Sequence, residues 1–209
     1  MPDRKDVALA VEAAACAQLY RTMQLEGIVG WDAFRQAVTG YHKIAGRKLG
    51  CADTDRFLPP VHREAPFWFD MKQHRLLFSS VVSHGKNSGG VYATSFSNEY
   101  GSYKSSLGFY LTETTYQGKN GYSLILNGLE RGINDRARER AIVMHGAAYA
   151  DPSVVGKGGR LGRSFGCPAV PQKLTRPIID AIKGGSVMYI YAETPDYLAH
   201  SSVLSGYRA

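Results

Sequence analysis

The amino-acid sequence predicts an α+β fold that is mainly β, with a helical N-terminal part followed by a larger strand-rich part. Apolar residues at helical spacing occupy the N-terminal region. Short aromatic and β-branched runs, separated by glycine and proline, fill most of the remainder. The 23 glycines and 13 tyrosines among 209 residues favour turn-rich β structure over a helical bundle. A chain of this length can bury one domain and carry a small helical appendage.

Two helices are expected in an N-terminal hairpin over residues 1–46. Residues 4–25 are rich in alanine and keep apolar residues at helical spacing until the glycines that follow. Residues 47–66 contain several glycines and prolines and little periodicity, so they predict a linker to the main domain, residues 67–209. The second helix is indicated by apolar residues at three- and four-residue steps: Trp31, Phe34, Val38 and Tyr41.

Strands are expected where aromatic, β-branched and other apolar residues form short runs. The Asn-Gly pair at 120–121 predicts a tight hairpin. Irregular segments are expected over 84–108, rich in Gly, Ser and Asn, and over 151–163, rich in Gly and Arg. A short C-terminal helix is expected over Thr175–Lys183, with Pro177 in its first turn. The predicted strands cover residues 67–71, 75–82, 109–116, 122–126, 141–144 and 187–191.

Charge and hydropathy exclude several classes of protein. The formal net charge of +7 favours anionic partners, but the basic residues are scattered and form no nucleic-acid-binding signature, so no nucleic-acid partner is expected. No run of about 18 apolar residues occurs, so no membrane span is expected. Glu12 interrupts the N-terminal apolar run, and no export signal is visible. Either the protein is cytoplasmic or an export signal has been removed.

Three cysteines leave at least one free thiol. Cys16 lies in the alanine-rich helix and is expected to pack as a small apolar residue, whereas Cys51 follows a glycine in a loop. No Cys-x-x-Cys pair occurs, so a structural zinc site is not expected. Neither a metal nor a cofactor is predicted.

The strongest chemical signal is a histidine and a cysteine close together in the sequence. His145 closes a buried strand, and Cys167 lies between Gly166 and Pro168. A thiolate is the reactive form of cysteine, and a nearby imidazole can take its proton. Gly166 leaves space for a substrate carbonyl, and the backbone N–H groups of Gly166 and Cys167 could stabilise the oxyanion formed on attack.

Other polar residues lie in the same window. Arg160 and Arg163 place two cations on one loop, which suits binding of a carboxylate. Ser164 completes a G-x-S-x-G pattern, but no strand precedes it and prolines follow it, so a serine hydrolase is rejected. Ser164 is expected instead to support His145 or the substrate. Each residue alone is more typical of a structural role, whereas their joint occurrence favours catalysis.

The segment from His145 to Cys167 resembles the catalytic signature of YkuD-type L,D-transpeptidases, in which a histidine precedes an S-x-G-C element. The closer likeness is to the murein L,D-transpeptidase catalytic domain subfamily, and it extends from Phe67 to Tyr191. The motifs that carry this likeness occur in order, at residues 82–89, 93–98, 105–110, 116–119 and 140–146.

The resemblance implies a β-sandwich or partly open barrel that carries the catalytic cysteine. It implies that Cys167 attacks the L,D amide of a peptidoglycan stem peptide, releases D-alanine and forms a thioester. The amine of a second stem then resolves the thioester and makes a cross-link. His145 would be the base, oriented by the Gly146 carbonyl, and no cofactor would be needed. The donor and acceptor stems would be the partners, in the periplasm or cell envelope.

One departure concerns Phe165, because the commoner family pattern has histidine before the Gly-Cys pair. Phe165 is expected to shape the pocket instead. His84, Tyr116 and Tyr149 are further candidate substrate-binding residues. Water in place of the second amine would give an L,D-carboxypeptidase or endopeptidase, and the first step is the same for both outcomes. A non-catalytic wall-binding protein is the remaining alternative. The sequence predicts no particular oligomeric state.

Overall fold

The computed structural model describes residues 4–45, 56–58 and 67–207. Cys51 and most of the predicted linker lie outside these ranges. The helices are α1 (Arg4–Thr22), α2 (Trp31–Ala45), α3 (Val155–Gly158), α4 (Gln172–Ile182) and α5 (Pro195–His200). The strands are β1 (Arg56–Leu58), β2 (Phe67–Asp70), β3 (Arg75–Ser79), β4 (Gly108–Gly118), β5 (Gly121–Gly128), β6 (Val143–Ala147), β7 (Ala169–Pro171) and β8 (Val187–Ile190).

The strands form one sheet in the order β3-β2-β1-β8-β4-β5-β6-β7. The pairs β1–β8 and β6–β7 are parallel and the other pairs are antiparallel. The two edges approach each other, because Ser83, beyond the end of β3, forms an isolated antiparallel bridge to Ala169 of β7. The sheet therefore curls into a partly open barrel, and the predicted α+β fold class is confirmed.

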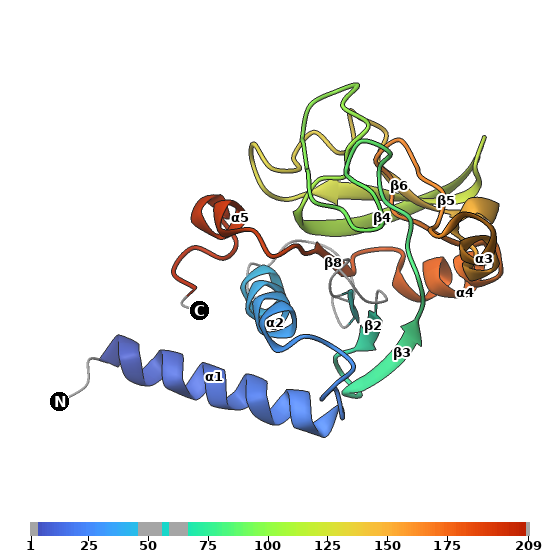
Figure 1. The fold of residues 1–209 in the computed structure, drawn as a ribbon. Coiled ribbons are helices and arrows are strands. Elements are labelled where there is room, and N and C mark those ends of the chain that lie inside the picture. The colour runs from blue at the N-terminus through green and yellow to red at the C-terminus, as the bar shows by residue number, and fades with distance from the viewer. Residues whose placement is uncertain (1–3, 46–55, 59–66, 208–209) are drawn as a thin grey trace.

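The N-terminal helices share one hydrophobic core with the sheet. Helix α2 lies between α1 and β8 (Figure 1), and Phe34 packs edge-on against Phe69 with ring centroids 6.1 Å apart. Tyr189 on β8 donates a hydrogen bond to Gln36 of α2 at 2.7 Å. Gly40 lets helix α2 pack closely against the Phe109 ring, because a Cβ at this position would clash with that ring. These contacts fix the helical part to the strands that lead to the candidate site.

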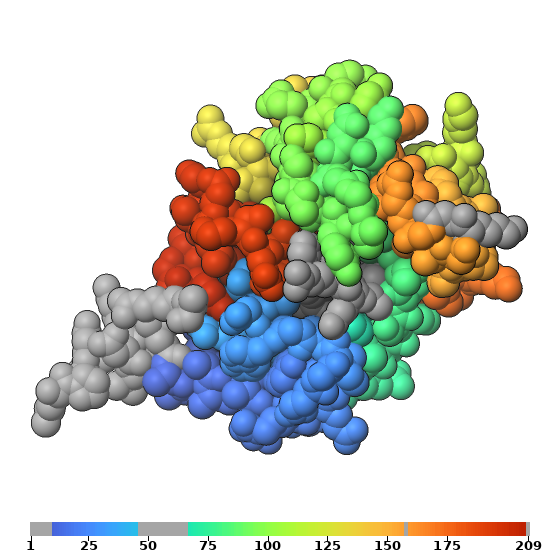
Figure 2. All heavy atoms as spheres, viewed as in Figure 1, coloured from blue at the N-terminus to red at the C-terminus, as the bar shows by residue number. Residues whose placement is uncertain are grey.

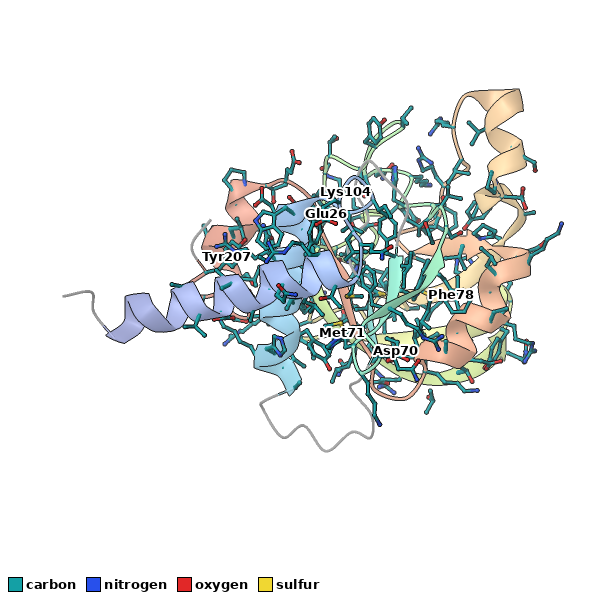
Figure 3. All side chains as sticks on the ribbon, turned by 90° about the horizontal axis from the view of Figure 1, so that it is seen from below. Glu26, Asp70, Met71, Phe78, Lys104 and Tyr207 are labelled. Carbon is teal, nitrogen blue, oxygen red and sulfur yellow. The ribbon has the colours of Figure 1, made fainter. Side chains whose placement is uncertain are left out.

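The C-terminal segment covers the other side of α2. Lys43 donates a hydrogen bond to the Ser205 carbonyl at 2.8 Å, and the two segments are in contact in Figure 2. The Arg35 guanidinium lies 4.6 Å from the centroid of the Tyr207 ring, which projects beside the helices in Figure 3. Buried Glu130 accepts hydrogen bonds from Tyr197 and Ser201, and so anchors α5.

Several expectations differ from the structure. Strands β1 and β7 were not predicted, because three residues are too few to show a periodicity. Helix α5, at Pro195–His200, was also not predicted. Helix α4 begins at Gln172, so Pro177 lies inside it rather than in its first turn. Proline removes one helical hydrogen bond, and the buried face around Ile178 and Ile179 offsets that loss. A short helix, α3, interrupts the loop predicted over 151–163.

Candidate functional site

His145 occupies the middle of β6, between β5 and β7. Its partners in the sheet are Ser123 on one side and Ala169 on the other. The side chain is 4% exposed, and Nδ1 lies 3.1 Å from the Gly146 carbonyl oxygen. With the proton on Nδ1 and donated to this carbonyl, Nε2 carries the free lone pair. The strand therefore presents an oriented imidazole that can act as a base.

Cys167 lies immediately before β7 and next to the same part of β6. Because His145 pairs with Ala169 in a parallel ladder, the register places Cys167 beside Val143, two residues before His145. The ladder continues through a bond from the His145 N–H to the Pro168 carbonyl at 3.4 Å. Neighbouring strands lie about 4.8 Å apart. The histidine and the cysteine are thus diagonal neighbours on adjacent strands, and Cys167 is partly exposed.

Burial sets the charge state of both groups. It raises the pKa of the Cys167 thiol above its ordinary value, although a hydrogen bond to the Val143 backbone and the charge of Arg140 act in the opposite direction. Burial also lowers the pKa of His145, against the smaller effect of its bond to Gly146. At neutral pH the pair is therefore a thiol and a neutral imidazole.

Ser164 organises the turn that carries the cysteine. Its hydroxyl donates to the Cys167 carbonyl at 2.6 Å and accepts from the Gly166 N–H at 3.1 Å. Ser164 was expected to support His145 or the substrate, and both hydroxyl contacts lie instead within the turn. The Gly166 N–H is also occupied. Within the described part of the chain, the Cys167 N–H has no bonded acceptor, which leaves it available to an oxyanion.

The irregular segment predicted over 84–108 supports this turn from the other side. The Ser105 hydroxyl donates to the Gly166 carbonyl and accepts from the Gly85 N–H, both at 3.1 Å. Gly166 has a φ of +124°, and a Cβ there would lie 2.8 Å from the Lys104 carbonyl oxygen. Ser105 was not predicted as a site residue. Its position in the motif at residues 105–110 is the feature of the sequence that could have identified it.

Arg163 and Arg160 occupy different environments. The Arg163 guanidinium bonds to the carbonyls of Leu161 and Gly162, at 2.7 and 2.9 Å, and to the carbonyl of Gly90. It therefore fastens two loops together and has little capacity left for a substrate carboxylate. Burial and the charge of Arg160 lower its pKa. Arg160 itself is exposed.

The candidate residues His84 and Tyr149 lie close to this loop. His84 is buried, its Nδ1 lies 3.0 Å from the Gly85 carbonyl, and burial with nearby Arg163 lowers its pKa. Tyr149 packs against Gly162. Burial, and to a smaller extent the charge of Cys167, raise the pKa of Tyr149 to about 12.

Tyr116 and Phe165 are both exposed and lie on different sides of the site. Tyr116 pairs with Ser123, which pairs with His145, so the three occupy one row across β4, β5 and β6. Phe165 is 66% exposed, and its ring centroid lies 4.9 Å from that of Tyr103. The Lys86 amine lies 4.1 Å from the Tyr103 centroid and 4.7 Å from that of Phe165. An aromatic pair with an ammonium group thus flanks the cysteine turn.

A pocket of about 520 Å³ lies beside α5 rather than at the cysteine, lined by residues that include Asn98, Arg131 and His200. Among residues 4–45, 56–58 and 67–207, no group of three or more His, Cys, Asp or Glu side chains could hold a metal ion. No helix within those ranges has the length and apolar character needed to cross a membrane.

The two buried histidines predict a loss of stability in mild acid. Their pKa values are lowered in the folded state, so below about pH 6.5 the unfolded chain binds protons that the folded chain does not. The free energy of unfolding should therefore fall between pH 7 and pH 5, as measured by urea denaturation. His84→Gln should reduce this fall, whereas His74→Gln, at an exposed site, should not. An equal fall in both variants would contradict the prediction.

Comparison with known proteins identifies a related family. A family described as L,D-transpeptidase catalytic domain matches residues 28–191, more than half of the chain. No curated protein matches. Among solved structures, an L,D-transpeptidase from Mycobacterium smegmatis is 11% identical with a TM-score of 0.42; the match covers 66% of this chain and 59% of that chain. This chain therefore spans well under two thirds of that protein.

Two further solved structures are similar at the same level. An L,D-transpeptidase from Stackebrandtia nassauensis is 14% identical with a TM-score of 0.41, covering 88% of this chain and 79% of that one. The LD transpeptidase LdtMt1, solved in complex with imipenem, is 12% identical with a TM-score of 0.40, covering 66% and 59%.

Proposed function

Because this chain belongs to the L,D-transpeptidase catalytic domain family, we propose that it is a cysteine acyltransferase that acts on peptidoglycan stem peptides in the cell envelope. The observation that carries the proposal is the placement of His145 on β6 and Cys167 just before β7 as diagonal neighbours. The imidazole is oriented by the Gly146 carbonyl, and the cysteine is partly exposed. A nucleophile, an oriented base and a backbone donor are the parts that acyl transfer requires.

The first half-reaction acylates the cysteine. His145 Nε2 takes the proton of the Cys167 thiol as the sulfur attacks the carbonyl carbon of the L,D amide between meso-diaminopimelate and D-alanine. The Cys167 N–H stabilises the negative oxygen of the tetrahedral intermediate. The C–N bond then breaks, and the imidazolium returns the proton to the amine of the departing D-alanine.

The second half-reaction resolves the thioester. The amine of a second stem attacks the thioester carbonyl, and His145 takes one proton from that amine. The C–S bond breaks, the sulfur recovers a proton from the imidazolium, and a cross-link remains. If water replaces the amine, the same steps give a carboxypeptidase or endopeptidase.

The surroundings of the cysteine suit a ligand with both carboxylates and apolar surface. Phe165 and Tyr103 offer exposed aromatic faces, and Lys86 supplies positive charge beside them. Arg160 is a second, exposed cation on the loop that precedes the cysteine turn. We assign these residues to the surface of the protein that binds the stem peptide. Tyr116 is assigned to the same surface because it lies in one row with His145. His84, Tyr149 and Arg163 instead support the loops behind the site.

The test is product analysis of purified tetrapeptide muropeptides incubated with the protein, by chromatography and mass spectrometry. Release of D-alanine with cross-linked dimers supports transpeptidation, and release with tripeptide monomers alone supports the hydrolytic alternative. Cys16→Ala is the matched control, because Cys16 is buried in the helical region, where burial raises its pKa to about 11. The absence of any product with the folded native chain would overturn the proposal.

A covalent probe gives a second test that needs no muropeptide. Imipenem is present in the solved complex of a similar protein. We expect intact-protein mass spectrometry to find an imipenem adduct with the native chain and with Cys16→Ala. The adduct should be missing from Cys167→Ala. An adduct that persists in Cys167→Ala would assign the reactive group elsewhere.

A further inference from the structure

Arg140 is a half-buried cation that immediately precedes the residues leading into β6. Its Nη1 donates to the Ser97 carbonyl at 2.7 Å and to the Ser106 hydroxyl at 2.5 Å. Its Nη2 donates to the Lys104 carbonyl at 2.7 Å and to the Ser102 hydroxyl at 3.3 Å. All four acceptors are neutral, and within the described part of the chain no carboxylate forms an ion pair with Arg140.

These bonds decide what the guanidinium can do. The two terminal nitrogens of arginine carry four N–H groups, and here four acceptors occupy them. Arg140 therefore has no fork of donors left to grip a substrate carboxylate. Arginine also stays protonated even where burial lowers its pKa, as it does here. The side chain is a fixed positive charge that is not cancelled at contact distance.

This charge lies directly behind the cysteine turn. The Lys104 carbonyl that binds Nη2 also leaves no room for a side chain at Gly166. A Cβ added there would lie 2.8 Å from that oxygen and 3.5 Å from Nη2 itself. On the other side, the Cys167 sulfur lies 3.7 Å from the carbonyl of Ala141, the residue that follows Arg140. The charge of Arg140 lowers the pKa of Cys167, against the larger effect of burial.

We propose that Arg140 is a positioning residue that stabilises the thiolate of Cys167 electrostatically without touching the substrate. The proposal rests on the proposed function only in naming Cys167 as the nucleophile. When the thiol proton moves to His145, the sulfur becomes negative beside a cation that needs no reorganisation. A preorganised charge in a partly dry site has a larger effect than the same charge in water.

The other charged groups nearby do not supply this effect. Arg136 is ion-paired with Glu99 and Glu139, at 2.9 and 3.1 Å, so its charge is compensated. The Lys104 amine donates to the Ser95 hydroxyl at 2.7 Å. Burial raises the pKa values of Tyr110 and Tyr149, so both are neutral at the pH of interest, as is His145. Arg140 is the cation without a carboxylate partner whose guanidinium lies against the cysteine turn, and its charge is the one that lowers the pKa of Cys167.

The experiment measures how fast iodoacetamide alkylates Cys167 as the pH rises, with the modified peptide quantified by mass spectrometry. Arg140→Gln removes the charge, and we expect alkylation at pH 8 to slow about tenfold as the midpoint of the profile rises, since a tenfold change corresponds to about one pKa unit. Arg140→Lys keeps the charge and should recover most of the rate. Arg136→Gln is the matched control and should change the rate less than twofold.

A second variant tests the charge without removing the arginine. Ser102→Asp places a carboxylate where the Ser102 hydroxyl now meets Nη2, and it should slow alkylation as Arg140→Gln does. This variant decides the question if Arg140→Gln does not fold. An unchanged midpoint in folded Arg140→Gln or in Ser102→Asp would overturn the proposal. The readout uses no peptidoglycan, so it is independent of the muropeptide test.

Discussion

Replacing Cys167 by alanine should abolish acyl transfer, and replacing His145 by alanine should slow acylation by about 10²- to 10⁴-fold. In the proposed mechanism the sulfur forms the covalent bond, so no other group can substitute for it. The imidazole only moves the proton, and solvent hydroxide can do this slowly at high pH. The measurement is the rate of D-alanine release from purified muropeptides, with Cys16→Ala as the control.

The pH profile separates the two roles. In His145→Ala the residual rate should rise with pH through the raised pKa of the Cys167 thiol, because the thiolate must then form without a base. Full activity in Cys167→Ala would remove the basis of the proposed chemistry. A His145→Ala enzyme as fast as the native one at pH 7 would assign the base elsewhere.

Replacing Gly166 by alanine should cost both stability and activity. The residue has a φ of +124°, where a side chain is strained, and the new Cβ would lie 2.8 Å from the Lys104 carbonyl oxygen and 3.0 Å from Ile142 Cδ1. Backbone strain and overpacking each cost about 1–3 kcal/mol. We expect the free energy of unfolding to fall by a few kcal/mol, with acylation at least about tenfold slower because the cysteine turn must shift.

Gly132→Ala is the matched control for this prediction. Gly132 has a φ of +78° and nothing within 4 Å of its Cβ position, so it shares the backbone penalty but not the clash. Urea denaturation should find a loss of about 1–2 kcal/mol with unchanged turnover. If the two variants lose equal stability and keep equal activity, the close approach of Gly166 to Lys104 has no functional importance.

The parts of the fold that the sequence predicts are those with local signals. Trp31 to Tyr41 showed a helical period and form α2, and the Asn-Gly pair at 120–121 joins β4 to β5. Strands β1 and β7 are each only three residues long, and each depends on a strand outside its own local sequence: β1 pairs with β8, and β7 pairs with β6. They exist because other strands supply their hydrogen bonds, which no local pattern encodes.

The residues of the candidate site also divide into those whose roles the sequence predicts and those whose contacts it does not. His145 and Cys167 could be named because their residue types carry chemistry and because their context resembles a known family. The contacts of Ser164 and Arg163 could not, since a hydroxyl or a guanidinium in a loop has many possible partners until the loops are placed. Arg140 lies within the motif at residues 140–146, but only the positions of Lys104 and Gly166 indicate its relation to the sulfur.

The bridge between Ser83 and Ala169 also protects the chain against association with other chains. Strand β7 is the last strand of the sheet, and an open edge there would offer backbone groups to any passing extended peptide. Ser83 occupies both the N–H and the carbonyl of Ala169, at 3.1 and 2.8 Å. The strand that follows Cys167 is therefore closed to intermolecular pairing at this position, while the turn before it, which carries the candidate nucleophile, stays open.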